Sequence, residues 1–161
     1  KGIAYATKSD YHPLNVRAGK MGVLAKDPGH FYSWLELNSD FWHSLDSTFA
    51  TLKITADSYV SRKLYAAYLK DVFCQSLEMA QKKNIVCTIV HDQAIDAGIN
   101  QKGYIEVILE KEKPLIVDQL VLAVGTPPNQ TFSFETEDLL ESPRYVRDIW
   151  DFNAESRLRD L

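Results

Sequence analysis

The strongest constraint in the sequence is a four-residue apolar spacing that runs through residues 61–84. Two adjacent rows share it: Leu64, Tyr68 and Val72 form one, and Tyr65, Leu69, Phe73 and Leu77 form the other. Residues four apart lie on the same face of an α-helix, so the pattern predicts a helix of about six turns with one broad buried stripe. Ser61 can cap its start, and Asn84 can take the left-handed conformation that often ends a helix.

Two shorter helices are predicted upstream of this long helix. Asp27-Pro28 is typical of an N-cap followed by proline in the first turn, and apolar residues at helical spacing follow it, so we expect a helix over 28–38. A second helix is expected over 39–49. Trp34, Trp42 and the tyrosines of the long helix are expected in the core. Residues 1–26 have no sustained period and predict an irregular loop.

After Asn84 the apolar spacing changes from helical to strand-like. The runs 85–90, 94–100 and 104–110 predict strands, with turns at 101–103 and 111–114. Residues 117–124 are nearly all apolar and predict a strand buried on both faces, which Gly125 and two prolines then end. The fold class expected from the residues is therefore α+β: helices first, then an antiparallel β-meander and one core strand.

Charge and cysteine content narrow the class of protein. The net charge of −4, from 18 basic and 22 acidic residues, argues against a nucleic-acid binder with a basic stripe. The sequence has no apolar run of 18 residues, so we expect no membrane-spanning helix and no membrane partner. Cys74 and Cys87 lie in apolar runs and predict two reduced, buried thiols in a cytoplasmic protein.

Motifs that would supply catalytic groups are nearly absent. The four histidines, His12, His30, His43 and His91, fall in different predicted elements, and neither an HExxH nor a GxSxG motif occurs. Asp92 and Asp96 are interpreted as turn residues. The phosphate-binding GxGxxG pattern is also missing. The residues therefore predict a binding segment with no catalytic residue and no metal site of its own.

Several segments resemble one protein family, and they occur in that family's order. Residues 117–125 resemble a strand that ends in Ala-Thr-Gly next to FAD, with Val124 in place of the threonine. Residues 2–7 and 12–21 resemble G-x-A-Y-x-T and H-L-L-N-V-x-A-x-x-M. Residues 27–35 resemble D-D-P-x-x-F-x-x-W-L, and 61–69 resemble P-R-x-x-Y-G-x-Y-L. Residues 143–151 resemble the segment before a second dinucleotide fingerprint. The family is that of bacterial FAD-NAD(P)-binding flavoproteins with two dinucleotide-binding domains.

The resemblance implies a domain organisation that accounts for the missing glycine motifs. In that family one GxGxxG lies upstream of the region that matches Gly2, and the other lies downstream of the region that matches Trp150. The chain is then expected to be a middle piece: a fragment of an α/β FAD-binding Rossmann-like domain. Its parts would be a loop and helical insertion (1–57), a long helix (58–84), the β-meander and core strand (85–128), and a connection toward the second dinucleotide domain (129–161).

Six positions are expected to contact the cofactor because of the resemblance. They are Asn15, Arg17, Arg62, Ala94, Ala123 and Gly125. An amide suits the flavin edge and a guanidinium suits a phosphate, although the family commonly has a small residue where Arg17 stands. Ala94 would offer its backbone to adenine, and Ala123 and Gly125 would allow close backbone approach. For each position an ordinary structural role in a loop, a helix start or a turn remains the alternative.

The function implied is that of a segment of an FAD-dependent, NAD(P)H-linked oxidoreductase with an unknown small-molecule substrate. The flavin would carry out the redox chemistry. The chain alone is expected to be inactive, and it is expected to self-associate through an exposed sheet edge. A cofactor-free binding or scaffold domain that retains a flavoprotein-like fold is the alternative.

Overall fold

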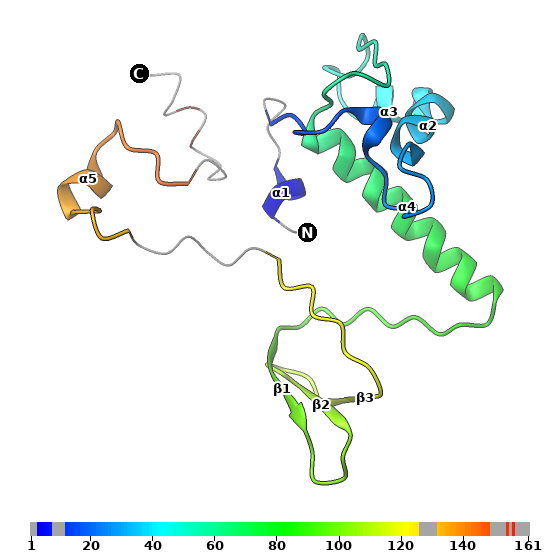
Figure 1. The fold of residues 1–161 in the computed structure, drawn as a ribbon, viewed down its shortest axis with the longest axis vertical. Helices are drawn as coiled ribbons and strands as arrows, with labels where there is room; N and C mark the ends of the chain where they lie inside the picture. The colour runs from blue at the N-terminus through cyan, green and yellow to red at the C-terminus, as the bar shows by residue number, and fades with distance from the viewer. Residues whose placement is uncertain (1–2, 8–11, 126–131, 149–153, 155, 157–161) are drawn as a thin grey trace. The chain divides into compact units, whose positions relative to one another are not determined.

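The computed structural model describes residues 3–7, 12–125, 132–148, 154 and 156 (Figure 1). The chain divides into two compact units, one made of Lys1–Ser76 with Gly125–Leu161 and the other of Leu77–Val124. The helices are α1 (Ile3–Ala6), the 3₁₀ turn η1 (Ala18–Lys20), α2 (His30–Leu37), α3 (Ser39–Ser44), α4 (Arg62–Lys82) and α5 (Glu137–Glu141). The strands are β1 (Ala94–Ile99), β2 (Ile105–Leu109) and β3 (Leu115–Val117).

An aromatic core joins α2 to the first half of α4. The ring of Phe31 lies 4.9 Å from that of Tyr65 and 5.0 Å from that of Tyr68, and Trp34 lies 5.5 Å from Tyr68. Trp42 is buried in the same cluster, so the core positions predicted for the tryptophans and tyrosines are confirmed. Tilted and edge-on ring pairs of this kind add about 1 kcal/mol each beyond area burial.

The buried stripe of α4 is shorter than predicted. Leu64, Tyr65 and Tyr68 are buried, but Phe73, one turn beyond the partly buried Leu69, is 51% exposed. The prediction of six buried turns was wrong because spacing reports which residues share a face, and burial needs a partner along that whole face. Both predicted ends are confirmed: Ser61 Oγ accepts from Leu64 N–H at 3.2 Å, and Asn84 has a φ of 56°.

The helices α2 and α3 lie where the sequence predicts them, although α3 ends earlier than predicted. The predicted range for α3 reached residue 49, but the helix stops at Ser44. The carboxylate of Asp46 explains this, because its Oδ1 accepts from both the N–H and the hydroxyl of Thr48, at 3.0 Å and 2.9 Å. A side chain that bonds the backbone two residues ahead favours a turn over another helical turn.

The three strands form an antiparallel sheet in the order β1-β2-β3. This confirms an antiparallel meander and the strands predicted over 94–100 and 104–110, whereas β3 begins two residues before the predicted strand 117–124. Cross-strand partners lie on one face, so the register gives the sheet two apolar rows, Ile99–Ile105–Val117 and Ala97–Val107–Leu115. The opposite face carries Gly98, Glu106 and Ile116. The turn role predicted for Asp92 is confirmed, since its Oδ2 accepts from the N–H groups of Lys111 and Glu112 at 2.9 Å and 2.8 Å. The same prediction for Asp96 was wrong, because Asp96 lies within β1 and pairs with Ile108.

Two predicted strands are not strands in the structure. Residues 85–90 have no regular structure, and in the predicted strand 117–124 only Val117 pairs, as the end of β3. Val86 is 90% exposed and Val121 is 86% exposed. A strand needs a neighbour for its backbone groups, and within the described residues neither run has one. The prediction of a strand over 85–90 and of a buried core strand over 117–124 was therefore wrong.

Both cysteines are also exposed, which corrects the prediction that they are buried. Cys74 lies beyond the buried part of α4, and Cys87 lies in the unpaired run 85–90. Both thiols therefore share the exposure of the segments that carry them.

Three contacts to the side chain of Glu135 hold residues 132–148 together. The carboxylate accepts from the hydroxyl of Tyr145 at 2.7 Å, from Nε of Arg147 at 2.9 Å and from the N–H of Phe132 at 2.7 Å. The Tyr145 hydroxyl is the main cause that lowers the pKa of Glu135. Residues 126–128 of the predicted stop and 149–151 of the last resembling segment lie outside the described residues.

Candidate functional site

A pair of antiparallel segments carries the predicted residues of the larger unit. Residues 12–19 run beside 56–62, joined by hydrogen bonds from Leu14 N to Val60 O at 2.8 Å and from Ala18 N to Ser58 O at 2.9 Å. Gly19 N donates to Ala56 O at 2.8 Å. A Cβ on Gly19 would lie 2.9 Å from the Cβ of Ala56, so this close approach requires glycine.

Side chains alternate along these segments as they do along strands. Leu14 and Ala18 point into the core, whereas Asn15 and Arg17 are exposed. On the facing segment Val60 is buried, and Asp57 and Tyr59 are exposed. The apolar residues of this alternating pattern therefore pack the two segments against the core, and the polar side chains between them face solvent. We call Asn15, Arg17, Asp57 and Tyr59 the polar platform.

The Arg17 guanidinium is hydrogen-bonded to Asp57, and Tyr59 also affects its pKa. Its Nη1 donates to Asp57 Oδ1 at 2.8 Å, and its pKa is raised, chiefly by a hydrogen bond with Tyr59 and then by the bond with Asp57. A guanidinium has five N–H donors in one plane and stays charged at any physiological pH. The bond to Asp57 uses Nη1, and the guanidinium carries further N–H donors that suit an anionic ligand.

Arg62 ties the first segment to the start of α4. Its Nε donates to the carbonyl of Pro13 at 3.0 Å, and its backbone N–H donates to the carbonyl of His12 at 2.8 Å. The guanidinium carbon lies 5.9 Å from the ring centre of Tyr5. Arg62 thus stabilises the loop that carries Asn15 and Arg17.

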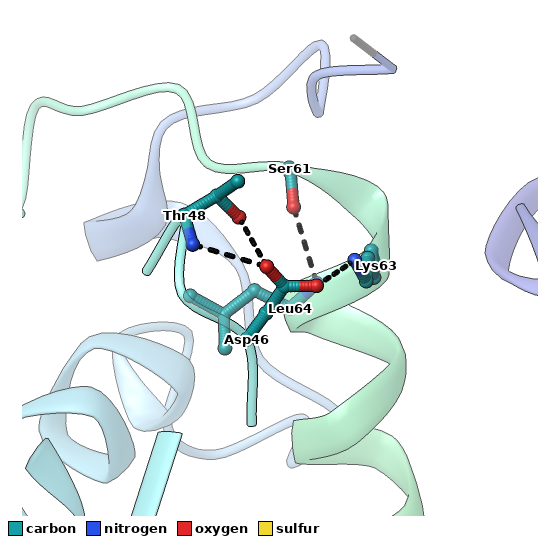
Figure 2. Close-up of polar contacts among 5 residues, drawn as sticks. All are labelled: Asp46, Thr48, Ser61, Lys63 and Leu64. Atoms are coloured by element: carbon teal, nitrogen blue, oxygen red, sulfur yellow. Dashed lines mark hydrogen bonds and ion pairs between the residues drawn. The ribbon is translucent and has the colours of Figure 1, made fainter. Parts of the chain in front are cut away.

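Next to Arg62, Lys63 forms an ion pair that the sequence analysis did not identify. Figure 2 shows its Nζ donating to Oδ2 of Asp46 at 2.5 Å, while Thr48 donates to the other carboxylate oxygen. The Lys63 bond is the largest cause that lowers the pKa of Asp46 to about 2. Lys63 also lies 5.4 Å from the ring centre of Phe49. These contacts fix the connection after α3 onto α4.

The other three predicted residues, Ala94, Ala123 and Gly125, lie outside the two segments that carry the polar platform. Ala94 opens β1 opposite Leu109, beside a register shift. Ala123 lies in the exposed run that follows β3, and Gly125 has a φ of 72°, which favours glycine. Ala94 and Ala123 belong to the unit Leu77–Val124, whereas Asn15, Arg17 and Arg62 belong to the other unit.

The sheet unit has a shallow depression of about 500 Å³ beside β2 and β3. Its apolar lining includes Ile89, Leu109 and Leu115, and its polar lining includes His91 and Lys113. None of the six predicted residues lines this depression. Among the described residues, no three His, Cys, Asp or Glu side chains lie close enough together to hold a metal ion.

Asp57 and Tyr59 are the platform residues that sequence reasoning missed. They lie between the helices predicted over 39–49 and 61–84, without a motif or an apolar spacing that marks them. Asp57 is 40 residues from Arg17 in the chain. The one signal available was the alternation of apolar and polar residues in both segments, and nothing in the sequence says that the two segments pair.

A family profile described as FAD-NAD(P)-binding matches residues 1–127. The chain belongs to the FAD-NAD(P)-binding family. The matched range includes the polar platform, α4, the sheet and all six predicted positions. Membership supports a flavoprotein type of function in general, with a flavin or a nicotinamide dinucleotide as cofactor. Comparisons with curated proteins and with solved structures gave no match. Within the residues described, no helix is both long and apolar enough to span a membrane.

The polar platform has hydrogen-bond donors that fit the pyrophosphate and the ring edge of a dinucleotide such as FAD or NAD(P). A dinucleotide carries a negatively charged pyrophosphate, which planar N–H donors on Arg bind well. Arg17 presents such donors at an exposed position, and the exposed Asn15 amide can donate or accept at a ring edge. Nε of Arg62 fits less well because the Pro13 carbonyl already uses it.

Proposed function

We propose that the chain is part of an FAD-dependent oxidoreductase that takes electrons from NAD(P)H. The observation that carries this proposal is the FAD-NAD(P)-binding family match over residues 1–127. The isoalloxazine ring supplies the electron transfer when it is bound, and the protein's task is to bind and orient it. This division of work agrees with the sequence, which offers binding residues without a recognisable catalytic motif.

The chain's place in that enzyme is proposed to be the segment that completes the FAD-binding domain. The support is the pair of apolar runs 85–90 and 118–124, which are strand-like in composition and exposed in the structure. Runs that are apolar on both faces are typical of strands inside a parallel sheet. On this proposal further strands of a Rossmann-like sheet cover them, and the chain alone is inactive.

Within this scheme the polar platform holds the phosphate-bearing part of the cofactor. Arg17 would donate to phosphate oxygens, and Asn15 would bond the flavin edge or a phosphate. Arg62 would hold the loop through Pro13. Ala94, Ala123 and Gly125 would offer backbone groups or close approach to the cofactor. Exposed free thiols at Cys74 and Cys87 favour a reducing compartment, so we propose a cytoplasmic location.

The isolated chain is also proposed to self-associate, because unpaired apolar runs favour pairing with another copy. Sedimentation velocity over a hundredfold range of concentration tests this. A rising weight-average mass is expected, whereas a monomer at every concentration would contradict it.

Anaerobic reduction tests the proposed function. The protein from the complete reading frame is loaded with FAD, and NADH or NADPH is added while the visible flavin absorbance is recorded. Bleaching by one of the two is expected. An FAD-loaded protein that neither cofactor reduces would contradict the NAD(P)H link. A protein that takes up no FAD would favour the alternative, a cofactor-free binding or scaffold domain.

A further inference from the structure

The ion pair between Arg17 and Asp57 is too exposed to contribute much to the stability of the fold. The guanidinium is 51% exposed and its partner Asp57 is 80% exposed. Ion pairs this open to solvent contribute little to stability and often nothing measurable. The two segments are already joined by backbone hydrogen bonds and by the buried Leu14, Ala18 and Val60. The effect of Asp57 is therefore on where the guanidinium lies.

A hydrogen bond from Nη1 to Asp57 fixes the direction of the Arg17 side chain, and Tyr59 lies on the same segment as Asp57. Asp57 and Tyr59 are two residues apart, and both are exposed beside Arg17. An arginine loses side-chain conformational freedom when a ligand immobilises it, which weakens binding. A guanidinium that is already held by a hydrogen bond loses less on binding, which raises affinity without a new ligand contact.

We infer that Asp57 and Tyr59 are positioning residues that hold the Arg17 guanidinium ready to bind a phosphate of the dinucleotide cofactor. This inference rests on the proposed function, since it needs a phosphate-bearing cofactor at the polar platform. It assigns a role to two residues that touch Arg17, with Arg17 itself as the group that contacts the ligand.

The test compares FAD with riboflavin, which has the same ring system and no phosphate. Dissociation constants are measured by flavin fluorescence on the protein from the complete reading frame. Arg17→Gln is expected to weaken FAD binding roughly ten- to hundredfold, the loss of one charge-assisted contact, and to leave riboflavin unchanged. Asp57→Asn and Tyr59→Phe are expected to weaken FAD binding about three- to tenfold, again without an effect on riboflavin.

Three further variants separate positioning from general structural damage. Asp57→Asn is expected to have no added effect in an Arg17→Gln background, because it acts through Arg17. Asp57→Glu restores the carboxylate and is expected to recover most of the FAD affinity. Asp40→Asn removes an equal charge from the first turn of α3 and is expected to change neither affinity.

Distinct outcomes overturn the inference and the proposed function. Normal FAD affinity in Arg17→Gln, or equal losses for FAD and riboflavin in Asp57→Asn, would overturn the inference while the flavin function stands. Tighter FAD binding by Asp57→Asn would also overturn it, because the carboxylate would then compete with phosphate. A wild-type protein that binds neither ligand would overturn both.

Discussion

The hydroxyl of Tyr68 lies 2.7 Å from Nδ1 of His30 and accepts a hydrogen bond from the N–H of Val23 at 3.2 Å. The hydroxyl proton is therefore free to point at Nδ1. Tyr68 is fully buried on α4, and the two partners lie 38 and 45 residues earlier in the chain. One phenol thus ties the loop before α2 and the start of α2 to the long helix.

Tyr68→Phe is expected to lower the free energy of unfolding by about 1–2 kcal/mol. The variant keeps the ring but leaves the Val23 N–H and His30 Nδ1 without this partner. Urea unfolding monitored by circular dichroism measures the change. Tyr104→Phe is the matched control, because Tyr104 is half exposed, and no change is expected there. Equal stability of Tyr68→Phe and wild type would contradict the role of this contact.

Phe31→Ala is expected to destabilise the protein by about 3–5 kcal/mol, since it removes a fully buried ring from the aromatic core. Phe73→Ala, on the exposed second half of α4, is expected to cost less than about 1 kcal/mol. Thermal unfolding of both variants measures the difference. A large loss in Phe73→Ala would mean that the predicted six-turn stripe is buried after all.

The Asp46–Lys63 pair predicts a specific pH dependence of stability (Figure 2). The pKa of Asp46 is lowered to about 2 in the folded chain, chiefly by Lys63, and is about 3.9 in an unfolded chain. The contribution is therefore fully present above about pH 4 and is lost as the pH falls toward 2. Urea unfolding at several pH values between 2 and 7 measures it.

Asp46→Asn and Lys63→Gln are the variants for this test. Each variant is expected to have a lower free energy of unfolding at pH 7 and a smaller loss of stability between pH 4 and pH 2. The loss in the double variant is expected not to exceed the sum of the two single losses. A steep acid loss that persists unchanged in Asp46→Asn would show that other carboxylates cause it.

Asn84 holds a left-handed conformation at the end of α4, where Ile85 N donates to Ala80 O at 2.9 Å. Asn84→Gly is expected to raise the free energy of unfolding by a few tenths of a kcal/mol, and Asn84→Ala to lower it by about 1 kcal/mol. Thermal unfolding measures both changes. A stabilising Asn84→Ala would contradict the left-handed cap.

Local signals in the sequence predicted α2, α3, α4, β1 and β2, whereas α1 and η1 lie in residues predicted as an irregular loop and α5 was not predicted. The spacing of Leu64, Tyr65 and Tyr68 marks a helix face, and Asn84 marks its end, because both features act within a few residues. Turn residues between 100 and 104 mark β1 and β2 in the same way. The strands predicted over 85–90 and 117–124 were wrong. An apolar composition indicates a preference for burial, whereas a strand also needs a neighbouring strand to pair with.

The candidate site could be predicted only in part. The resemblance pointed to Asn15 and Arg17, and the structure places both on the polar platform. Asp57 was beyond reach because its bond to Arg17 joins residues 40 apart in the chain, and no local pattern encodes that pairing. Contacts of this kind depend on how two loops pack, which spacing within either loop does not report.

The 161-residue chain alone is expected to bind FAD weakly or not at all. It lacks a GxGxxG turn, and such a turn places the N–H groups of a helix N-terminus on the pyrophosphate. Flavin fluorescence titration of the isolated chain measures this. A low-micromolar dissociation constant would show that the polar platform and the sheet unit suffice, and would contradict the proposal that the chain completes a larger domain.

The visible absorption spectrum of the protein from the complete reading frame tests the central claim most directly. The two absorption bands of oxidised flavin are expected, either as purified or after addition of FAD and removal of the excess. A protein that stays colourless after FAD is added would contradict a flavin-dependent function. The FAD-NAD(P)-binding family membership would then stand as a statement about ancestry and fold alone.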